Sequence, residues 1–316
     1  MGLDGIHHVT AITADAQRAI DFHAGVLGLR LVKTTVNFDA PDMYHLYFGD
    51  ETGSPGSILT FFEIRGAREG HAGAGMIQRI VFRVPSVEAL EVWAARLGDA
   101  GRPVDMVDDA LVSSDPEGLG LELVVEQPAD GERRTARAPG LAPEHAISGI
   151  VGVRAHSDAP DFTREMLGAL GFEDEGMGRL VTSGAERRGL YLLDERPASP
   201  GVPGAGTVHH VAWTSPDADH TAWGARVRDA GGRPTQVIDR QYFHSIYFHE
   251  PGGVLFEMAT PSPGFAVDED PERLGQELRL PPQYEPYRAK IEERLTPLRR
   301  PERDPAPVAS TTTEGE

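Results

Sequence analysis

The stretch Gly5-Ile-His-His-Val-Thr10 reads as the start of a strand, and its pattern returns about two hundred residues later as Thr207-Val-His-His-Val-Ala212. The second copy is followed by Glu250-Pro-Gly-Gly-Val-Leu-Phe-Glu-Met258, which adds a carboxylate on another short apolar segment. Two histidines and one carboxylate form a metal site that leaves one face of the ion open. Such a site suits a non-haem Fe(II) enzyme that binds both a substrate and O₂. A single His-His pair could equally be packed or exposed, but two copies at matching positions favour the metal site.

The histidine pairs lie in the first and last of four segments that share one order of elements. Each segment reads as a strand, a helix and then two or three strands. In the first, apolar residues recur at helical spacing over 14–27, and Gly28 ends the helix. The second has its helix over 86–98, with Ser86 as the expected N-cap. The segments run approximately over 5–63, 75–127, 146–195 and 206–260.

This repeat predicts an α+β fold made of four βαβββ units. One such unit cannot bury its sheet face alone, whereas two units side by side form a curved, cup-like sheet with helices on its outer face. Four units therefore make two cups, or half-barrels. Because the histidine pairs belong to units one and four, we expect these two units to pair around the metal. Units two and three would then form a metal-free cup.

Loops rich in Gly, Pro and charge separate the units, and the loop at 128–144 is the expected boundary between two halves. We predict an N-terminal module over 1–135 and a C-terminal module over 145–262, each holding two units. Residues 263–316 form an extension, with a short helix near 286–298 and a disordered tail from about residue 300.

Composition narrows the class of protein. The chain has 316 residues and no cysteine, which excludes disulfides, thiolate zinc sites and a cysteine nucleophile, so any metal must be held by His and carboxylate. The net charge of −19 argues against a nucleic-acid partner. No apolar run is long enough to span a membrane, and no signal-like segment opens the chain, so we expect a cytoplasmic location without membrane contact.

At this point the chain resembles the vicinal oxygen chelate superfamily, which includes glyoxalase I and the extradiol dioxygenases. It is most similar there to the ring-cleaving dioxygenases of the hydroquinone type. The resemblance is carried by both His-His-Val segments, by Tyr44-His-Leu-Tyr-Phe-Gly-Asp50 and by the long stretch from Asp239 through Tyr247 to Glu257. It covers the chain to about residue 298 and includes Leu280-Pro-Pro-Gln-Tyr284.

The resemblance implies a dioxygenase that uses Fe(II), with Mn(II) as the alternative ion, and acts on a small aromatic diol and O₂. It also implies that His8, His210 and Glu257 are the metal ligands. Strand alternation alone does not choose between the two members of each histidine pair. The partners His7 and His209 are expected either to orient the ligands and contact substrate or to pack under the helices.

Further candidates precede Glu257 in the chain. Tyr247 is expected on the neighbouring strand, where its hydroxyl could contact substrate or O₂ and move a proton. Arg240 could hold a phenolate. Weaker candidates are Tyr44, His45, His244 and His249 as polar groups, and Tyr242, Phe243 and Phe248 as pocket walls.

Two alternatives remain open at the level of sequence. A glyoxalase-like isomerase would need a fourth protein ligand, for which Glu63 is the candidate, and a resistance protein would bind a quinone or drug without turnover. In unit two, Glu122 aligns with Glu257 but has no histidine partners, so we expect a surface or structural role for it. The ring substituents and the oligomeric state, including a homo-oligomer, are left open.

Overall fold

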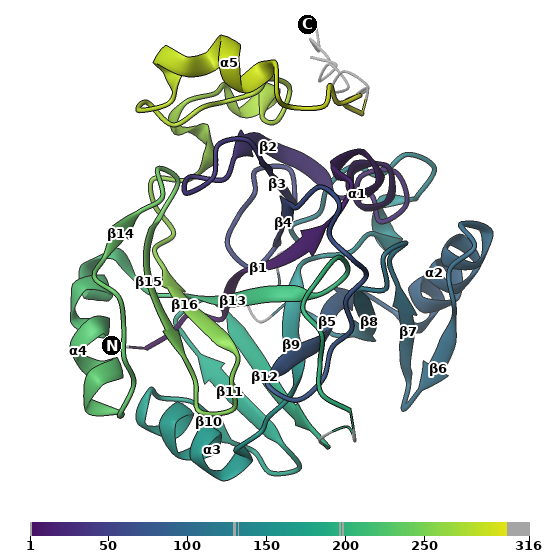
Figure 1. The fold of residues 1–316 in the computed structure, drawn as a ribbon. Helices are drawn as coiled ribbons and strands as arrows, with labels where there is room; N and C mark the ends of the chain where they lie inside the picture. The colour runs from purple at the N-terminus through teal and green to yellow at the C-terminus, as the bar shows by residue number, and fades with distance from the viewer. Residues whose placement is uncertain (1, 129–130, 132, 196, 198, 302–316) are drawn as a thin grey trace, which may run out of the picture.

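Each of the four predicted repeats forms one βαβββ unit in the computed structural model (Figure 1). The structure describes residues 2–128, 131, 133–195, 197 and 199–301. Units one and two contain, in chain order, β1 (Ile6–Thr13), α1 (Ala16–His23), β2 (Arg30–Val36), β3 (Tyr44–Gly49), β4 (Ile58–Glu63), β5 (Met76–Val84), α2 (Val87–Asp99), β6 (Asp105–Val107), β7 (Ala110–Ser114) and β8 (Gly120–Val125).

The second half of the chain repeats this order. Units three and four contain β9 (Ile150–His156), α3 (Pro160–Ala169), β10 (Glu173–Asp174), β11 (Arg179–Ser183), β12 (Arg188–Asp194), β13 (Val208–Thr214), α4 (His220–Asp229), β14 (Ile238–Asp239), β15 (His244–His249) and β16 (Leu255–Ala259). One-turn 3₁₀ helices lie at Pro143–His145 before β9 and at Asp217–Asp219 before α4.

The strands form two eight-stranded sheets, and each sheet combines units from both halves of the chain. The first has the order β14-β15-β16-β13-β1-β4-β3-β2, and the second has the order β10-β11-β12-β9-β5-β8-β7-β6. Units one and four therefore share one sheet through the antiparallel pair β1–β13. Units two and three share the other through β5–β9. The predicted pairing of units one and four, and of units two and three, is confirmed.

Helix α2 begins at its predicted N-cap, whereas α1 is shorter than predicted. The Ser86 hydroxyl accepts the backbone N–H of Ala89 and starts α2, which buries Ala89, Leu90, Trp93 and Leu97 on one face. Helix α1 ends at His23, four residues before the predicted end, because the chain turns there toward Gly28 at φ 68°. The helix of unit four begins as a 3₁₀ turn and becomes α-helical only at His220.

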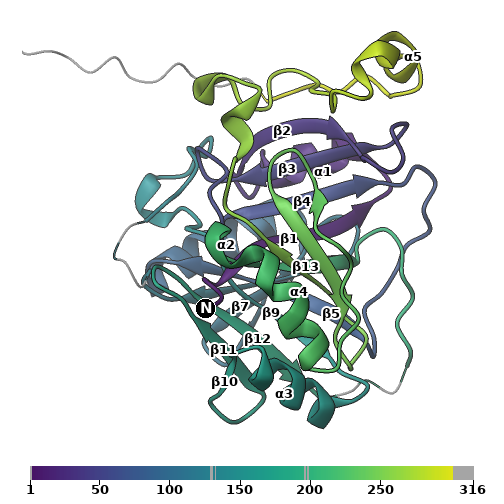
Figure 2. The same cartoon turned by 90° about the vertical axis from the view of Figure 1, so that its left-hand side faces the viewer.

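The C-terminal extension covers the β2 edge of the first sheet (Figure 2). The ammonium group of Lys33, fully buried on β2, donates to the carbonyl of Phe265 and to the carboxylates of Asp268 and Glu269. Thr34 also forms a parallel bridge with Leu278. An edge strand with unpaired backbone groups is a site for aggregation, so this cover protects the sheet.

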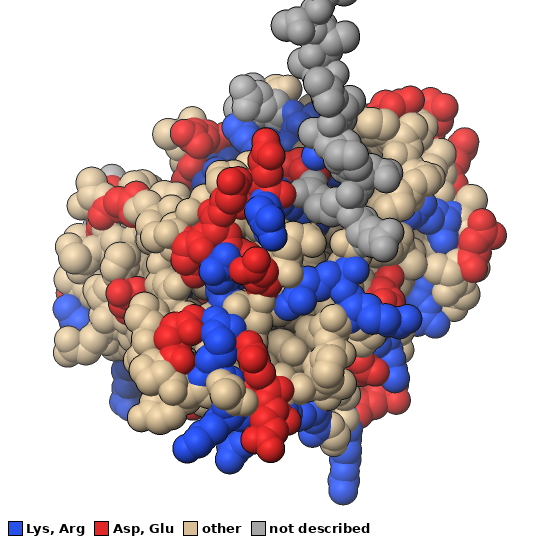
Figure 3. Space-filling view, turned by 90° about the horizontal axis from the view of Figure 1, so that it is seen from above, with Lys and Arg blue, Asp and Glu red and all other residues tan. Residues whose placement is uncertain are grey.

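Within the extension the chain forms 3₁₀ turns at Phe265–Val267, Pro271–Arg273 and Glu285–Tyr287, and a short helix α5 (Arg288–Glu292). This helix is shorter than the predicted 286–298, and most of the predicted disordered tail lies outside the described residues. Figure 3 looks onto this side of the molecule and shows acidic and basic side chains interspersed. Among the described residues, no helix is both long and apolar enough to cross a membrane.

Candidate metal centre

Three side chains from units one and four meet on the inner face of the first sheet. His8 lies on β1, His210 on β13 and Glu257 on β16, and these three strands are neighbours in the order β16-β13-β1. The Nε2 atoms of the two histidines are 3.2 Å apart, and Glu257 Oε2 lies 3.2 Å from His8 Nε2 and 3.0 Å from His210 Nε2. All three residues are buried. They form the one group of three or more potential ligands found in the part of the chain that the structure describes.

The spacing of these three atoms fits one face of a six-coordinate ion. Ligands at right angles, each about 2.1 Å from a metal, are about 3.0 Å apart, whereas tetrahedral ligands at that distance are about 3.4 Å apart. The observed separations of 3.0 to 3.2 Å are closer to the first value. Such an arrangement leaves three further positions for substrate, O₂ or water.

A β-bulge lies at the first histidine of each pair. On β1, Ile6 is opposite Trp213 and His8 is opposite Ala212, so His7 is an extra residue between two successive pairs. On β13 the register shifts in the same way around His209. A bulge interrupts strict alternation and changes the direction of a side chain. The two rings of each pair consequently touch instead of lying on opposite faces, with centroids 5.0 Å apart in the first pair and 5.1 Å apart in the second.

This contact gives each candidate ligand a hydrogen-bonding partner. His7 Nδ1 lies 2.8 Å from His8 Nδ1, and the same distance separates Nδ1 of His209 and His210. A histidine that binds a metal through Nε2 carries its proton on Nδ1 and donates it to a neighbour, which fixes the ring. His7 is suited to accept that proton because burial, followed by the charge of His8, holds its pKa well below the usual value and keeps the ring neutral.

The Glu257 carboxylate is held so that one oxygen remains available. Ser245 on β15 donates its hydroxyl proton to Oε1, while Oε2 receives no conventional hydrogen bond among the described residues. Burial would raise the pKa of Glu257, but His8 and His210 together lower it well below the usual value. A buried anionic oxygen that faces two imidazole nitrogens is what a cation site requires.

A pocket opens beside His8 and His210 and has the size of a small-molecule site. It encloses about 370 Å³, including its open mouth. Its walls combine aromatic rings with a few polar groups. The lining residues are His8, Thr10, Asn37, Phe38, Asp39, His45, Tyr47, Phe62, His210, Arg240, Phe243 and Tyr247.

Tyr247 and Arg240 reach this pocket together. Tyr247 lies on β15 directly opposite Glu257, and its ring centroid is 5.8 Å from that of His210. Arg240 Nε is 3.4 Å from the Tyr247 hydroxyl oxygen, and a second nitrogen of Arg240 pairs with Asp39 at 3.1 Å. Burial and then the charge of Glu257 raise the pKa of Tyr247, so this phenol stays protonated near neutral pH.

Several predicted candidates lie elsewhere. His244 and His249 are exposed at the two ends of β15 and do not line the pocket. Glu63 accepts the backbone N–H of Ala16 at the start of α1, and the Tyr44 hydroxyl donates to the carbonyl of Thr296. Tyr242 and Phe248 are buried but are also absent from the lining, whereas Phe243 and His45 belong to it.

Sequence reasoning did not identify several residues of the site. Thr10 and Tyr47 line the pocket, and Ser245 orients Glu257. Thr10 had a signal, since it follows His8 by two residues and a strand places such residues on one face. Tyr47 and Ser245 had the same signal, since they lie two residues from His45 and Tyr247, but their roles depend on pairing across strands that only the folded sheet specifies.

The second sheet contains a salt-bridge cluster in place of a metal site. Glu122 on β8 is paired with Val81 on β5, just as Glu257 on β16 is paired with Ala212 on β13. Arg79 lies two residues before Val81, and His210 lies two residues before Ala212. Arg79 therefore occupies the position in the second sheet that His210 occupies in the first. The carboxylate pairs with Arg79 at 3.2 Å and with Arg154 at 2.6 Å. Glu122 is 2% exposed, so its role is structural and the expected surface alternative is wrong.

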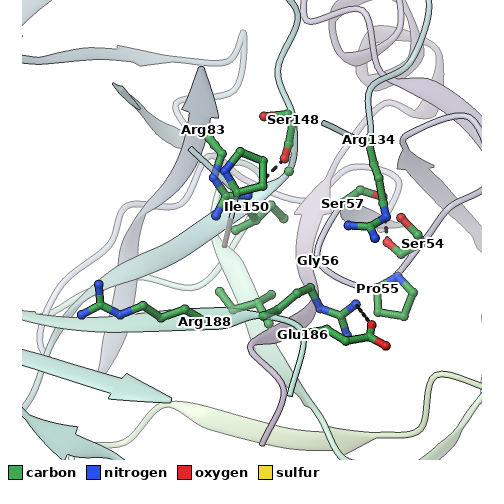
Figure 4. A pocket seen from close by; sticks show the side chains of 14 residues that line it. Ser54, Pro55, Gly56, Ser57, Arg83, Arg134, Ser148, Ile150, Glu186 and Arg188 are labelled. Atoms are coloured by element: carbon green, nitrogen blue, oxygen red, sulfur yellow. Dashed lines mark hydrogen bonds and ion pairs between the residues drawn. The ribbon is translucent and has the colours of Figure 1, made fainter. Parts of the chain in front are cut away.

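A second pocket, of about 490 Å³ including its mouth, lies where ends of the two sheets meet, and contains no comparable set of ligands (Figure 4). Its charged lining consists mainly of Arg83, Arg134, Arg187 and Arg188. Arg187 already pairs with Asp4 at 3.1 Å, and Arg188 pairs with Glu175.

Comparison with known proteins agrees with this fold. Two overlapping stretches, residues 5–123 and 117–258, match the model of the Glyoxalase/Bleomycin resistance protein/Dioxygenase superfamily. The chain thus belongs to this superfamily, which is the predicted one. A crystal structure of a candidate dioxygenase from Bacillus subtilis is 41% identical, with a TM-score of 0.87, and the match covers 95% of this chain and 99% of that one. Maize glyoxalase I, at 13% identity and a TM-score of 0.57 over 82% of this chain and 93% of its own, shares the fold.

Relatives with curated names point to one class of enzyme. The candidate ring-cleaving dioxygenase MhqO of Bacillus subtilis is 43% identical over 303 residues, which are 93% of this chain and 96% of that protein. Chlorohydroquinone/hydroquinone 1,2-dioxygenase of Sphingobium indicum is 35% identical over 304 residues, or 90% of this chain and 93% of that protein. The chain is a homologue of ring-cleaving dioxygenases.

Proposed function

We propose that the protein is an Fe(II)-dependent dioxygenase that opens the ring of a hydroquinone or catechol with O₂. The observation that carries this proposal is the facial triangle formed by His8, His210 and Glu257, whose two histidines line an aromatic-walled pocket. A relative that is named for hydroquinone cleavage supports the hydroquinone class. Mn(II) is the alternative ion, because it accepts the same His and carboxylate ligands.

The ligand set suits an ion that must bind two reactants. His8, His210 and Glu257 would hold one face of Fe(II), which supplies the redox chemistry that joins ring and O₂ and directs cleavage beside the ligated ring oxygen. The bulged partners His7 and His209 would keep the two ligand rings oriented through their Nδ1 contacts. Both oxygen atoms of O₂ would enter the ring-opened acid, so no external reductant is needed.

Tyr247 would act as a hydrogen-bond donor toward an oxygen of the reactants. Arg240 donates to the phenol oxygen, and the phenol keeps its own proton for donation. Because burial raises the pKa of Tyr247, the group favours donation over general-base catalysis near neutral pH. Arg240 adds positive charge on the same side, where it would stabilise a bound phenolate.

The aromatic walls would position the ring. Phe62 and Phe243 line the pocket beside the ligands, and the ring centroids of Phe243 and His8 are 5.0 Å apart. Flat apolar walls and a few polar groups suit a single substituted aromatic ring. A glyoxalase-like isomerase is less well supported, since Glu63, the candidate fourth ligand, caps α1 instead of reaching the site.

The test is O₂ uptake by protein reconstituted with Fe(II) under anaerobic conditions and then given a panel of hydroquinones and catechols. We expect uptake that requires Fe(II) and disappears in His210→Ala. The matched control is His244→Ala, which removes an exposed histidine of the same sheet that does not line the pocket. Zn(II) should bind without supporting uptake, because it has no redox chemistry. Stoichiometric Fe(II) binding with no uptake on any ring would refute the proposal.

A further inference from the structure

Four buried side chains form an unbroken hydrogen-bond chain that ends at the metal pocket. The Tyr47 hydroxyl lies 2.9 Å from His45 Nδ1, and His45 Nε2 lies 2.8 Å from the Thr60 hydroxyl. The Thr60 hydroxyl donates to the Thr10 hydroxyl at 3.0 Å. This hydrogen-bond chain crosses from β3 through β4 to β1. In the sheet register, Thr10 on β1 is opposite Thr60 of β4 on one side and opposite His210 of β13 on the other.

The direction of every hydrogen bond in this chain follows from the last one. Thr60 has a single hydroxyl proton and donates it to Thr10. The Thr60 oxygen must therefore accept a hydrogen bond from His45, which means that His45 carries a proton on Nε2. Burial holds the pKa of His45 well below the usual value, so the ring is neutral and has only one N–H. Nδ1 is then bare and accepts the proton of Tyr47.

This hydrogen-bond chain leaves one donor, the Thr10 hydroxyl, without an acceptor among the described residues. Thr10 accepts from Thr60, and its own proton has no acceptor among the described residues, although Thr10 is fully buried and lines the metal pocket. A buried hydroxyl normally satisfies its donor. Only a molecule in the pocket could accept this proton.

We propose that Tyr47 sets the polarity of this chain, so that Thr10 always presents a donor, and never a lone pair, to an oxygen of the pocket's ligand. Tyr47 is the far end of the chain and is 2% exposed. If His45 moved its proton to Nδ1, the Tyr47 hydroxyl would have to accept it, and its own proton would lose its only partner among the described residues. Tyr47 and His45 are thus positioning residues.

The consequence for catalysis rests on the proposed function. A fixed donor beside the ligands favours an oxygen that gains negative charge during the reaction and disfavours a neutral hydroxyl that must donate. With its polarity fixed, the hydrogen-bond chain holds a donor in place at Thr10.

The first test reads the tautomer of His45 and does not depend on activity. In protein labelled with ¹⁵N-histidine and loaded with Zn(II), the His45 signals, assigned by their absence in His45→Asn, should show Nε2 protonated and Nδ1 bare. In Tyr47→Phe the His45 tautomer with its proton on Nδ1 should gain population, because the hydroxyl that donates to Nδ1 has been removed. Tyr44→Phe is the matched control, since this neighbouring tyrosine of β3 donates to the C-terminal extension. A wild-type His45 protonated on Nδ1, or no change in Tyr47→Phe, would overturn the proposal.

The second test uses a double-mutant cycle on turnover. Thr10→Val should lower kcat by roughly tenfold with little change in KM, as expected for a hydrogen bond that strengthens in the transition state. Tyr47 also lines the pocket, but if its effect on turnover passes through Thr10, Tyr47→Phe should lower kcat by less and the double variant should be no slower than Thr10→Val. Additive losses would mean a general packing role for Tyr47. If the wild-type protein cleaves no ring, the proposed function fails, but the tautomer measurement still decides the polarity of the chain.

Discussion

Glu122 and Glu257 stand at corresponding positions of the two sheets, so the same substitution at each separates a structural carboxylate from a metal ligand. Glu122→Gln keeps the size of the side chain and one accepting oxygen but removes the charge that faces Arg79 and Arg154. Glu257→Gln makes the same change next to two histidines. We expect the first variant to lose stability and keep function, and the second to keep the stability of the metal-free protein and lose function.

The magnitude for Glu122 follows from its burial. Breaking a buried ion pair by removing one partner costs about 3 to 5 kcal/mol. Here the carboxylate is buried, but the side chains of Arg79 and Arg154 are 27% and 30% exposed, so water screens part of the interaction. We therefore expect Glu122→Gln to lower the free energy of unfolding by about 2 to 3 kcal/mol. For roughly 300 folded residues, that corresponds to a fall in Tm of about 3 to 5 °C.

The assay is thermal unfolding followed by circular dichroism, with and without Fe(II) or Zn(II), for both variants and the wild type. Glu122→Gln should unfold at lower temperature in both conditions and should retain the full increase in Tm that metal gives the wild type. Glu257→Gln should show no increase with metal. Glu126→Gln is the control. This glutamate of unit two, next to the second sheet, forms only a weak ion pair with Arg83, at 3.7 Å and with its own side chain partly exposed. If Glu122→Gln abolished the metal-dependent increase while leaving the metal-free Tm unchanged, the assignment of the two carboxylates would be refuted.

Three further predictions concern single side chains. Ser245→Ala should weaken metal binding by about tenfold, because Glu257 loses the hydroxyl that orients it, and competition with a chelator would measure this. Tyr247→Phe should reduce kcat by at least about tenfold and leave metal affinity unchanged, and a variant with normal kcat would exclude the phenol as a donor. Burial lowers the pKa of His23 to about 4, below the unfolded value of 6.5, so its contribution to stability is present above pH 6.5 and is lost as pH falls toward 4. That loss amounts to about 3 kcal/mol, and urea unfolding at several pH values should show a shallower decline for His23→Phe.

The order of the four units could be predicted from sequence because two independent patterns agreed. The repeated order of strand and helix patterns predicted four units. The three expected metal ligands, His8, His210 and Glu257, lie in the first and last of these units, which must therefore meet to form one site. That requirement led to the sheet order that the structure has, with β1 beside β13. Helix lengths were less predictable, since the apolar residues after His23 pack against the core from a turn as well as they would from a helix.

The shape of the site depended on contacts between strands that no single stretch of sequence specifies. Polar groups such as Tyr47 and Ser245 matter because of the strand that lies opposite them, and that register is a property of the whole sheet. Glu122 looked like an isolated carboxylate because its partner Arg154 is 32 residues away, on a strand of another unit. Motif spacing can identify ligands on single strands, but it cannot identify what holds them.

The bulges explain why both histidines of each pair are needed. With regular alternation, His7 would point away from His8, and the ligand ring would lack an acceptor for its Nδ1 proton on the inner face of the sheet. One extra residue on β1 and one on β13 bring each partner to within 2.8 Å of its ligand. The two bulges lie on strands that pair with each other, so each shift of register on one strand is followed by a compensating shift on the other. The doubled histidine is therefore a single structural device, in which the first residue supplies both the bulge and the acceptor, and the second supplies the proposed metal ligand.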